Sequence, residues 1–275
     1  MSPVFGKMTQ LFLIGIGTGN PDHLTRQAHK AIAEADLILV PRKGDEKSDL
    51  ADLRHLIVAD VRADVDLVVS YFDMPKRSQN QPYLKAVTAW HDEIAQIWAA
   101  KISEHRQAQK IALMVWGDPA LYDSTLRIAA RLRPIPPITV IAGITSLQAL
   151  AAAHAIPLNT LGGEIIVTTG RRLSGERSPE NGSTVAVMLD GTCAFQQLLG
   201  QDLHIWWGAY LGMPQQLLMS GALDDVCQDI IKMRNAARED HGWIMDTYIL
   251  RSVQSLTPPL GFGLQVADRL RKDRN

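Results

Sequence analysis

A turn at residues 116–124 combines the residue types and the position that ligand binding in an α/β protein requires. It follows an apolar run at 111–116, which predicts a fully buried parallel strand, and it precedes a helical pattern that begins near Leu126. Because open α/β sheets bind ligands at the carboxyl ends of their strands, the Gly-Asp-Pro sequence within the turn is a candidate binding site. Gly117 lets the backbone approach a ligand closely, and Pro119 stiffens the turn. The alternative is an ordinary connection between a strand and a helix.

A second candidate loop has the pattern Gly-x-Gly-x-Gly at residues 15–19, after an apolar run that begins at Leu11. A dinucleotide-binding loop has the spacing Gly-x-Gly-x-x-Gly, which is absent here, and an acidic residue after the next strand. Here that strand ends in Arg42 and Lys43, whose charges would suit only the 2′-phosphate of NADP. An NAD(P)-dependent oxidoreductase is therefore the less favoured interpretation, and it stays open as an alternative.

Alternating strand and helix patterns position both loops and are typical of a doubly wound sheet with helices on both faces. A stiff connector with three prolines at 134–137 is the candidate boundary between domains at 1–135 and 136–275. The sequence thus predicts two α/β domains with largely parallel or mixed sheets. The predicted strands are 10–17, 37–40, 66–72, 111–116, 138–141, 164–169, 184–189, 204–210 and 243–250, and the predicted helices are 22–35, 49–58, 82–105, 126–132, 145–154, 194–200, 224–237 and 264–271.

The composition limits the classes of function. The chain has 275 residues, 46% of them apolar and 21% charged, so a sizeable core is expected rather than disorder. A net charge of −1 argues against nucleic-acid binding. Cys193 and Cys227 fit no metal or redox spacing and are interpreted as free thiols in a reducing cytoplasm. The apolar run at 11–16 is too short for a signal peptide, and no run of about 18 apolar residues predicts a membrane span.

Several short motifs follow one another in an order that resembles the tetrapyrrole methyltransferase family, whose members use S-adenosylmethionine. The similarity extends over nearly the whole chain. There are three departures: Thr18 and Ala142 replace prolines that are usual in the family, and Pro41 stands where relatives often carry an aspartate. The motifs are the loop at 15–20, Leu24-Thr25, Ala35-Asp36, Gly117-Asp118-Pro119 with Leu121 and Tyr122, the turn at 142–146, the alanine-rich helix at 149–153, and the strand that ends in Met188-Leu189.

This resemblance implies S-adenosylmethionine as the cofactor, held in an active-site cleft between the two domains. Backbone atoms of the Gly-Asp-Pro turn would bind it, and Thr18 would border the methyl-transfer region. Three residues of the second domain would wall the adenine, with ordinary core packing as the alternative for them. The implied cofactor residues are Thr18, Trp116, Gly117, Asp118 and Leu121 in the first domain, Thr145 and Ser146 at a helix start, and Leu189, Leu211 and Met245 as the adenine wall of the second domain.

Local features at 41–44, 207–214 and 241–248 are similar to a branch of the family that acts in cobalamin synthesis. The branch implies methyl transfer to ring carbon C1 of a precorrin, together with loss of an acetyl group as acetate. Methyl transfer needs mainly alignment and exclusion of water, whereas deacetylation needs a base or an oxyanion donor. The candidates for that second role are Asp118, Tyr122, Asp246 and His241, with capping, buried polar or solvated roles as the alternatives.

A substrate of this kind carries many carboxylates, which Arg42 and Lys43 are suited to bind. The resemblance further implies a homodimer. Its expected binding partner is a small-molecule tetrapyrrole substrate, with no metal, nucleic acid or membrane involved. Two alternatives stay open: a methylase of the same fold that acts on another corrinoid carbon, and a non-catalytic tetrapyrrole-binding protein.

Overall fold

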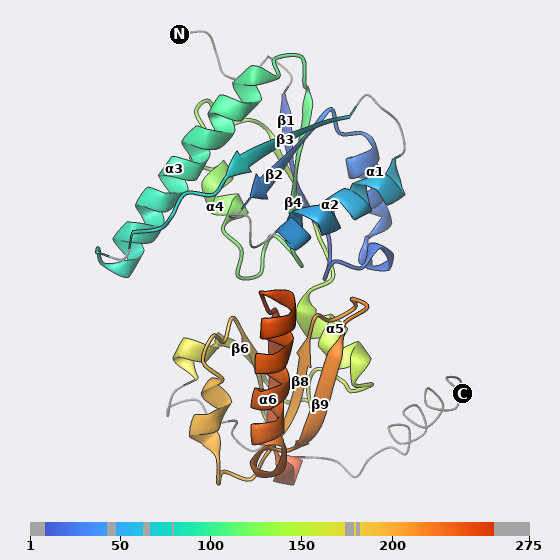
Figure 1. Ribbon diagram of the computed structural model, residues 1–275, viewed down its shortest axis with the longest axis vertical. Coiled ribbons are helices and arrows are strands. Elements are labelled where there is room, and N and C mark those ends of the chain that lie inside the picture. Colours follow the sequence, from blue (N-terminus) through green and yellow to red (C-terminus); the bar gives the residue numbers. More distant parts are fainter. Residues whose placement is uncertain are drawn as a thin grey trace. The chain divides into compact units, whose positions relative to one another are not determined.

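The computed structural model describes residues 9–42, 48–62, 67–78, 80–173, 179 and 182–255. The chain forms two compact units, Met1–Thr145 and Ser146–Asn275, each built around a five-stranded sheet (Figure 1). The helix predicted at 264–271 lies outside the described residues. None of the helices in the described part of the chain is both long and apolar enough to span a membrane.

The first unit contains the strands β1 (Gln10–Gly15), β2 (Leu37–Arg42), β3 (Val68–Asp73), β4 (Lys110–Val115) and β5 (Ile138–Ile141). They form a wholly parallel sheet in the order β3-β2-β4-β1-β5. β1 lies between β4 and β5, with Gln10 opposite Lys110 and Leu11 opposite Ile138. Because all five strands run in one direction, the loops that follow them share one edge of the sheet.

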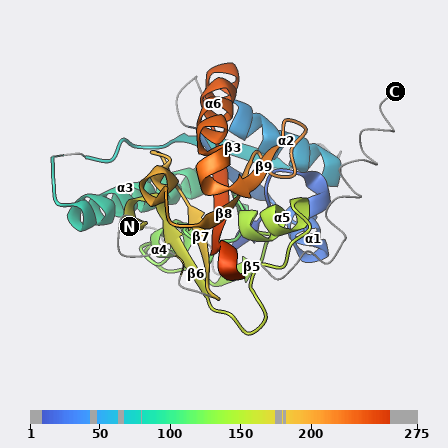
Figure 2. The ribbon, with the colours of Figure 1, turned by 90° about the horizontal axis from the view of Figure 1, so that it is seen from below.

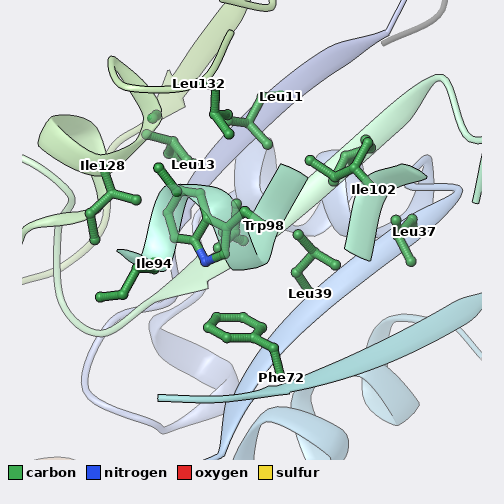
Figure 3. Close-up of a cluster of buried hydrophobic side chains, with 14 residues drawn as sticks. Leu11, Leu13, Leu37, Leu39, Phe72, Ile94, Trp98, Ile102, Ile128 and Leu132 are labelled. Carbon is green, nitrogen blue, oxygen red and sulfur yellow. The ribbon is translucent and has the colours of Figure 1, made fainter. Parts of the chain in front are cut away.

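The helices of the first unit are α1 (Arg26–Ala33), α2 (Ser48–Val61), α3 (Tyr83–Glu104) and α4 (Thr125–Ala129), with a 3-10 turn at Pro21–His23. They cover both faces of the sheet because successive side chains of a strand point to opposite faces. Leu13 of β1 packs in one apolar cluster with Trp98 of α3 and Ile128 of α4 (Figure 3). Its neighbour Ile14 packs in the other cluster, with Ile32 of α1.

The second unit contains the strands β6 (Ile165–Thr169), β7 (Thr184–Met188), β8 (Leu203–Ala209), β9 (Leu217–Ala222) and β10 (Asp246–Ser252). Their order is β6-β7-β10-β8-β9, and only the β6–β7 pair is parallel. The helices α5 (Ser146–Ala153) and α6 (Leu223–His241) pack against this sheet (Figure 2). Shorter 3-10 segments are Gly170–Arg172, Ala194–Leu198 and Val253–Ser255.

These two units confirm the predicted fold class of two α/β units with parallel and mixed sheets. Two elements of the second unit differ from the sequence expectation. The strand β9 was not predicted, and the helix predicted at 194–200 is a 3-10 segment.

The position of β5 moves the boundary between the units further along the chain than the sequence predicts. The proline-rich stretch at 134–137 was expected to separate the domains, which would assign β5 to the second one. Instead β5 pairs with β1, and the Leu11 nitrogen donates to the Pro137 oxygen at 2.9 Å. The prolines therefore connect α4 to the edge strand of the first sheet, and the first unit ends at Thr145.

Candidate active site

Three glycine-containing backbones meet where β1, β4 and β5 end. Gly17 and Gly117 form an isolated antiparallel bridge with N···O distances of 3.3 and 2.7 Å. A Cβ atom on Gly15 would lie 2.6 Å from the Gly143 nitrogen, and one on Gly143 would overlap the Gly117 oxygen. Only glycine permits such close approach of one backbone to another.

Asp118 ties two of these loops together. Its Oδ1 accepts a hydrogen bond from the Ala120 nitrogen at 2.7 Å, and its Oδ2 accepts one from the Gly143 nitrogen at 2.8 Å. Charge-assisted bonds of this kind are stronger than neutral ones. Since both carboxylate oxygens are engaged, the arrangement suits a positioning role for Asp118 better than the role of a base.

The backbone of Gly117 has open space beside it. Its φ is +64°, and among the described residues, its chain neighbours aside, a Cβ atom there would have only the Thr145 Cα within 4 Å, at 3.8 Å. Thr145 is buried and is followed by Ser146 at the start of α5. A ligand could therefore approach the Gly117 backbone closely, which fits the cofactor role predicted for this turn.

A buried arginine lies against the same turn. The Arg54 guanidinium group is centred 4.9 Å from the centroid of the Trp116 ring, and its Nε donates to the Met114 oxygen at 3.3 Å. Burial lowers the pKa of Arg54 to about 10, although the nearby charge of Asp123 opposes this shift. Arg54 thus remains a cation at neutral pH, directly beside a predicted cofactor residue.

Tyr122 is the most accessible of the predicted catalytic residues in the first unit. Its side chain is 44% exposed and its φ is +50°, a conformation that bulky residues rarely adopt. The preceding Leu121 is partly buried and donates its backbone N–H to the Asp118 oxygen at 3.2 Å. Strained backbone of this kind is concentrated at functional sites.

Arg42 ends β2 at the same edge of the sheet. Its guanidinium group lies 3.7 Å from the centroid of the Tyr71 ring, and the Tyr71 hydroxyl is hydrogen-bonded to His55. Stacking on an aromatic face restricts the side chain while leaving the edge of the guanidinium plane available for a carboxylate. Lys43, predicted with Arg42, lies outside the described residues.

Thr18 follows β1 and is partly buried. Its hydroxyl lies 2.7 Å from Nδ1 of His23, a residue of the adjacent 3-10 turn. The loop that carries Thr18 is thereby held close to the Gly17–Gly117 bridge.

The three predicted adenine-contacting residues come together at one edge of the second sheet. Thr247 is opposite Met188, and Asp246 is opposite Ala209. Met245, immediately before β10, is therefore flanked by the residues that follow β7 and β8, which include Leu189 and Leu211. The side chain of Leu189 is 65% exposed, that of Met245 is partly buried and that of Leu211 is buried.

Asp246, a predicted catalytic candidate, instead belongs to a buried ion pair. Its Oδ2 accepts from Arg234 Nε at 2.9 Å and from Trp207 Nε1 at 3.1 Å, and the side chains of Arg234 and Asp246 are each only 6% exposed. Burial by itself would lower the pKa of Arg234, but Asp246 more than offsets this, so that pKa lies above its ordinary value. The arrangement argues for a structural role of Asp246.

His241, the fourth candidate, is exposed at the end of α6. Its ring packs edge-on against Tyr210, with 5.2 Å between the centroids. Tyr210 is itself buried, and its hydroxyl donates to the Trp243 oxygen at 2.5 Å. This packing gives His241 a surface position over an aromatic side chain.

Comparison with known proteins identifies the family to which this architecture belongs. The family model of the tetrapyrrole (corrin/porphyrin) methylases matches residues 10–227. The chain belongs to this family. Among curated methylases, precorrin-6A synthase (deacetylating) from Sinorhizobium sp is 44% identical over 250 residues, which cover 89% of this chain and 95% of the relative.

Solved structures agree with the family. A cobalamin synthesis related protein (CobF) from Corynebacterium diphtheriae is 37% identical, with a TM-score of 0.75 over 90% of this chain and 99% of that chain. The uroporphyrin-III C-methyl transferase from Thermus thermophilus, complexed with S-adenyl homocysteine, is 18% identical, with a TM-score of 0.55 over 88% of this chain and 97% of that chain. The second likeness shows the tetrapyrrole methylase fold alone.

The sequence analysis of this tetrapyrrole methylase did not predict its buried arginines, of which Arg54 and Arg234 lie near the predicted site residues. Arg234 lies in the apolar stripe of α6, and Arg54 lies on the face of α2 that carries Ile57. A charged residue inside an apolar stripe indicates a buried partner, so the helical spacing held a signal for both.

Proposed function

We propose that this chain catalyses the reaction of precorrin-6A synthase (deacetylating), an S-adenosylmethionine-dependent C-methyltransferase. In that reaction the methyl group of S-adenosylmethionine is joined to ring carbon C1 of precorrin-5, its bond to sulfur breaks, and S-adenosylhomocysteine is released. The electron pair of the bond between C1 and the acetyl group stays on C1 and forms the new bond to the methyl carbon. The acetyl group leaves as acetate, with water supplying the second carboxylate oxygen, and precorrin-6A results. The observation that carries the proposal is the similarity to the Sinorhizobium enzyme, which extends over nearly the full length of both proteins.

The cofactor residues at the Gly-Asp-Pro edge are proposed to be Thr18, Trp116, Gly117, Asp118, Leu121 and Thr145 of the first unit, with Ser146 at the start of the second unit. The open side of the Gly117 backbone supports this assignment, because a ligand can approach there without meeting a side chain. When bound, S-adenosylmethionine supplies an electrophilic methyl group.

The adenine contacts of the second unit are proposed to be Leu189, Leu211 and Met245. Leu189 supports this role, because a large apolar side chain is left exposed there on a strained backbone. Covering it with an aromatic base would remove apolar surface from water.

Asp118 is proposed to align the cofactor loops rather than to transfer protons. Its two backbone hydrogen bonds fix the loop after β4 relative to the loop after β5. Such alignment carries most of the rate enhancement for transfer of a methyl group, which needs little acid–base help.

Tyr122 is proposed as the residue that assists deacetylation. Attack of water on the acetyl carbonyl places negative charge on its oxygen, and a phenol can donate a hydrogen bond to that oxygen. The support for Tyr122 is its position: its side chain is 44% exposed next to the Gly-Asp-Pro turn.

Arg42, with Lys43, is proposed to bind carboxylates of the substrate. The support is its place at the carboxyl end of β2 and the stacking on Tyr71, which presents a cation in a restricted orientation.

The decisive experiment is incubation of the protein with precorrin-5 and S-adenosylmethionine labelled in its methyl group, followed by mass spectrometry. We expect one labelled methyl group in a product that has lost the acetyl group, with release of one acetate. Methylation without acetate release would indicate a methylase that acts on another corrinoid carbon. Failure to bind S-adenosylhomocysteine in calorimetry would favour a non-catalytic tetrapyrrole-binding protein.

A homodimer in the cytoplasm is part of the same proposal, on the strength of the family resemblance. Light scattering of the purified protein tests the dimer, for which a mass of one chain would be the contrary result.

A further inference from the structure

We propose that Arg234 is a positioning residue for the adenosyl cofactor, because it joins the three segments that carry Leu189, Leu211 and Met245. This inference rests on the proposed function, which assigns those side chains to the adenine. Arg234 itself is buried and lies within α6, so it acts through its neighbours.

Leu189 is a residue whose conformation needs outside support. Its φ is +54°, and its side chain is largely exposed directly after β7. The backbone of a residue with a β-carbon is strained in this region of φ and ψ, so contacts with the surrounding structure must stabilise the conformation of Leu189. The support comes from the next residue, Asp190, which is buried.

Asp190 is fixed through both its side chain and its backbone. One carboxylate oxygen accepts from the Ala194 nitrogen at 2.6 Å and from the Tyr248 hydroxyl at 2.7 Å. The other accepts from the Thr192 nitrogen at 2.9 Å. The backbone oxygen of Asp190 accepts from Arg234 Nη2 at 3.0 Å.

The same guanidinium group reaches the segment of Met245. Arg234 Nε donates to Oδ2 of Asp246, the residue after Met245, at 2.9 Å. The planar fork of arginine is what allows one side chain to bond two segments at once, the one after β7 and the start of β10.

The segment of Leu211 is joined through β8. Trp207 Nε1 donates to the carboxylate of Asp246 at 3.1 Å, and the Tyr210 nitrogen donates to the Met245 oxygen at 3.0 Å. The buried ion pair of Arg234 and Asp246 is thus hydrogen-bonded, directly or through β8, to the segments that carry all three proposed adenine contacts.

Arg251 offers a matched control at the other end of β10. It is also buried, its Nε donates to the Thr184 hydroxyl at 2.9 Å, and it contacts the Pro157 oxygen. Since Thr184 begins β7, Arg251 joins the opposite ends of the same strands. A variant at Arg251 removes a comparable buried arginine and leaves the sheet edge that carries Leu189 unchanged.

The test compares Arg234→Lys with Arg251→Lys in the full chain. Lysine keeps the charge, but it cannot bridge two acceptors in the fork geometry of arginine. We expect both variants to lower the thermal midpoint. Only Arg234→Lys should raise the Kd for S-adenosylhomocysteine, by about tenfold, measured by calorimetry below the midpoint of the less stable variant.

An Arg234→Lys protein that binds S-adenosylhomocysteine within about twofold of the unaltered protein would overturn the inference. An equal loss of affinity in Arg251→Lys would also overturn it, because it would show that any loss of stability in the second unit weakens binding of S-adenosylhomocysteine. Should Arg234→Lys fail to fold, Tyr248→Phe removes only one bond to Asp190, and it should still weaken binding by about threefold. If the unaltered protein does not bind S-adenosylhomocysteine, the proposed function fails instead.

Discussion

At the scale of single residues, Arg42 provides the most direct test of substrate recognition. Changing it to Ala removes one exposed cation, and exposed ion pairs contribute about 1 kcal/mol or less, so the substrate KM should rise, by up to about fivefold. The affinity for S-adenosylhomocysteine should stay the same. Steady-state kinetics with precorrin-5 and calorimetry measure the two effects.

Arg106→Ala is the control for Arg42→Ala. Arg106 is exposed but precedes β4, at the amino-terminal edge of the same parallel sheet. Its loss should leave KM unchanged. Equal KM values for Arg42→Ala and the unaltered protein would assign Arg42 to the solvated surface.

Tyr122→Phe tests the residue proposed for deacetylation. Phenylalanine has the same backbone preferences, so the strained turn should keep its conformation while the hydroxyl is lost. We expect release of acetate to slow by about 100-fold, since removal of one oxyanion donor has costs of this size, while the Kd for S-adenosylhomocysteine is unaffected. Acetate quantified against time gives the rate, and a rate equal to that of the unaltered protein would exclude the role.

Residue types alone could identify the Gly-Asp-Pro turn, because its position after an apolar run and the requirements of glycine are local properties. The engagement of Asp246 could not be identified in this way. Its partners Arg234 and Trp207 come from α6 and β8, and only the packing of that helix against the sheet brings them together.

At the scale of elements, the contact between the loops after β1, β4 and β5 predicts a strong effect of a single methyl group. A Cβ atom on Gly143 would overlap the Gly117 oxygen, and backbone cannot rotate away as a side chain can. Gly143→Ala should therefore lower the free energy of unfolding by about 1–3 kcal/mol. It should also weaken binding of S-adenosylhomocysteine.

Gly191→Ala is the matched substitution for this test. In the part of the chain that the structure describes, a Cβ atom there has no neighbour within 4 Å beyond the adjoining residues, and the backbone is not left-handed. Its effect on unfolding should stay within about 0.5 kcal/mol. Urea denaturation of both variants gives the comparison, and similar unfolding free energies would contradict the close contact.

The sequence predicted the elements whose apolar patterns are strong and missed those that tertiary contacts decide. β1 and β4 are continuous apolar runs because both faces of their sheet are covered. β9 is an edge strand without fully buried residues, so neither alternation nor a continuous run marks it. The prolines before β5 look like a linker, yet β5 joins the first sheet through pairing with β1, which is remote in sequence.

At the scale of the whole molecule, one buried histidine and two partly buried ones predict how stability depends on pH. Burial lowers the pKa of His91 in the first unit and of His154 and His204 in the second; neighbouring cations add to this for His91 and His204. In the unfolded chain these groups bind a proton near pH 6.5. The unfolded state therefore binds more protons below that pH, and stability is lost as pH falls.

We expect the thermal midpoint to decrease between pH 7.5 and pH 5.5, with each histidine contributing at most about 1.4 kcal/mol per pH unit. His204→Phe should reduce this slope, because it removes one of the titrating groups. The centroids of the His204 and Trp206 rings lie 4.2 Å apart, and phenylalanine can keep that contact. Calorimetric midpoints at several pH values provide the measurement. A slope that the substitution leaves unaltered would show that other groups control the acid response.

The strand order of the first sheet also determines how this protein must be made. During translation β2 and β3 emerge one after the other and can pair, but β1 has only β4 and β5 as neighbours. Gln10 must wait for Lys110 to leave the ribosome. Until then the nascent chain exposes an apolar strand without a partner, a form that is prone to aggregation and is a target for chaperones. The residues that arrive last, those after β4 and β5, both complete the fold and carry the Gly-Asp-Pro turn and Gly143. A nascent chain of the first unit therefore gains the loops proposed to bind the cofactor only when the last strands of its sheet have emerged.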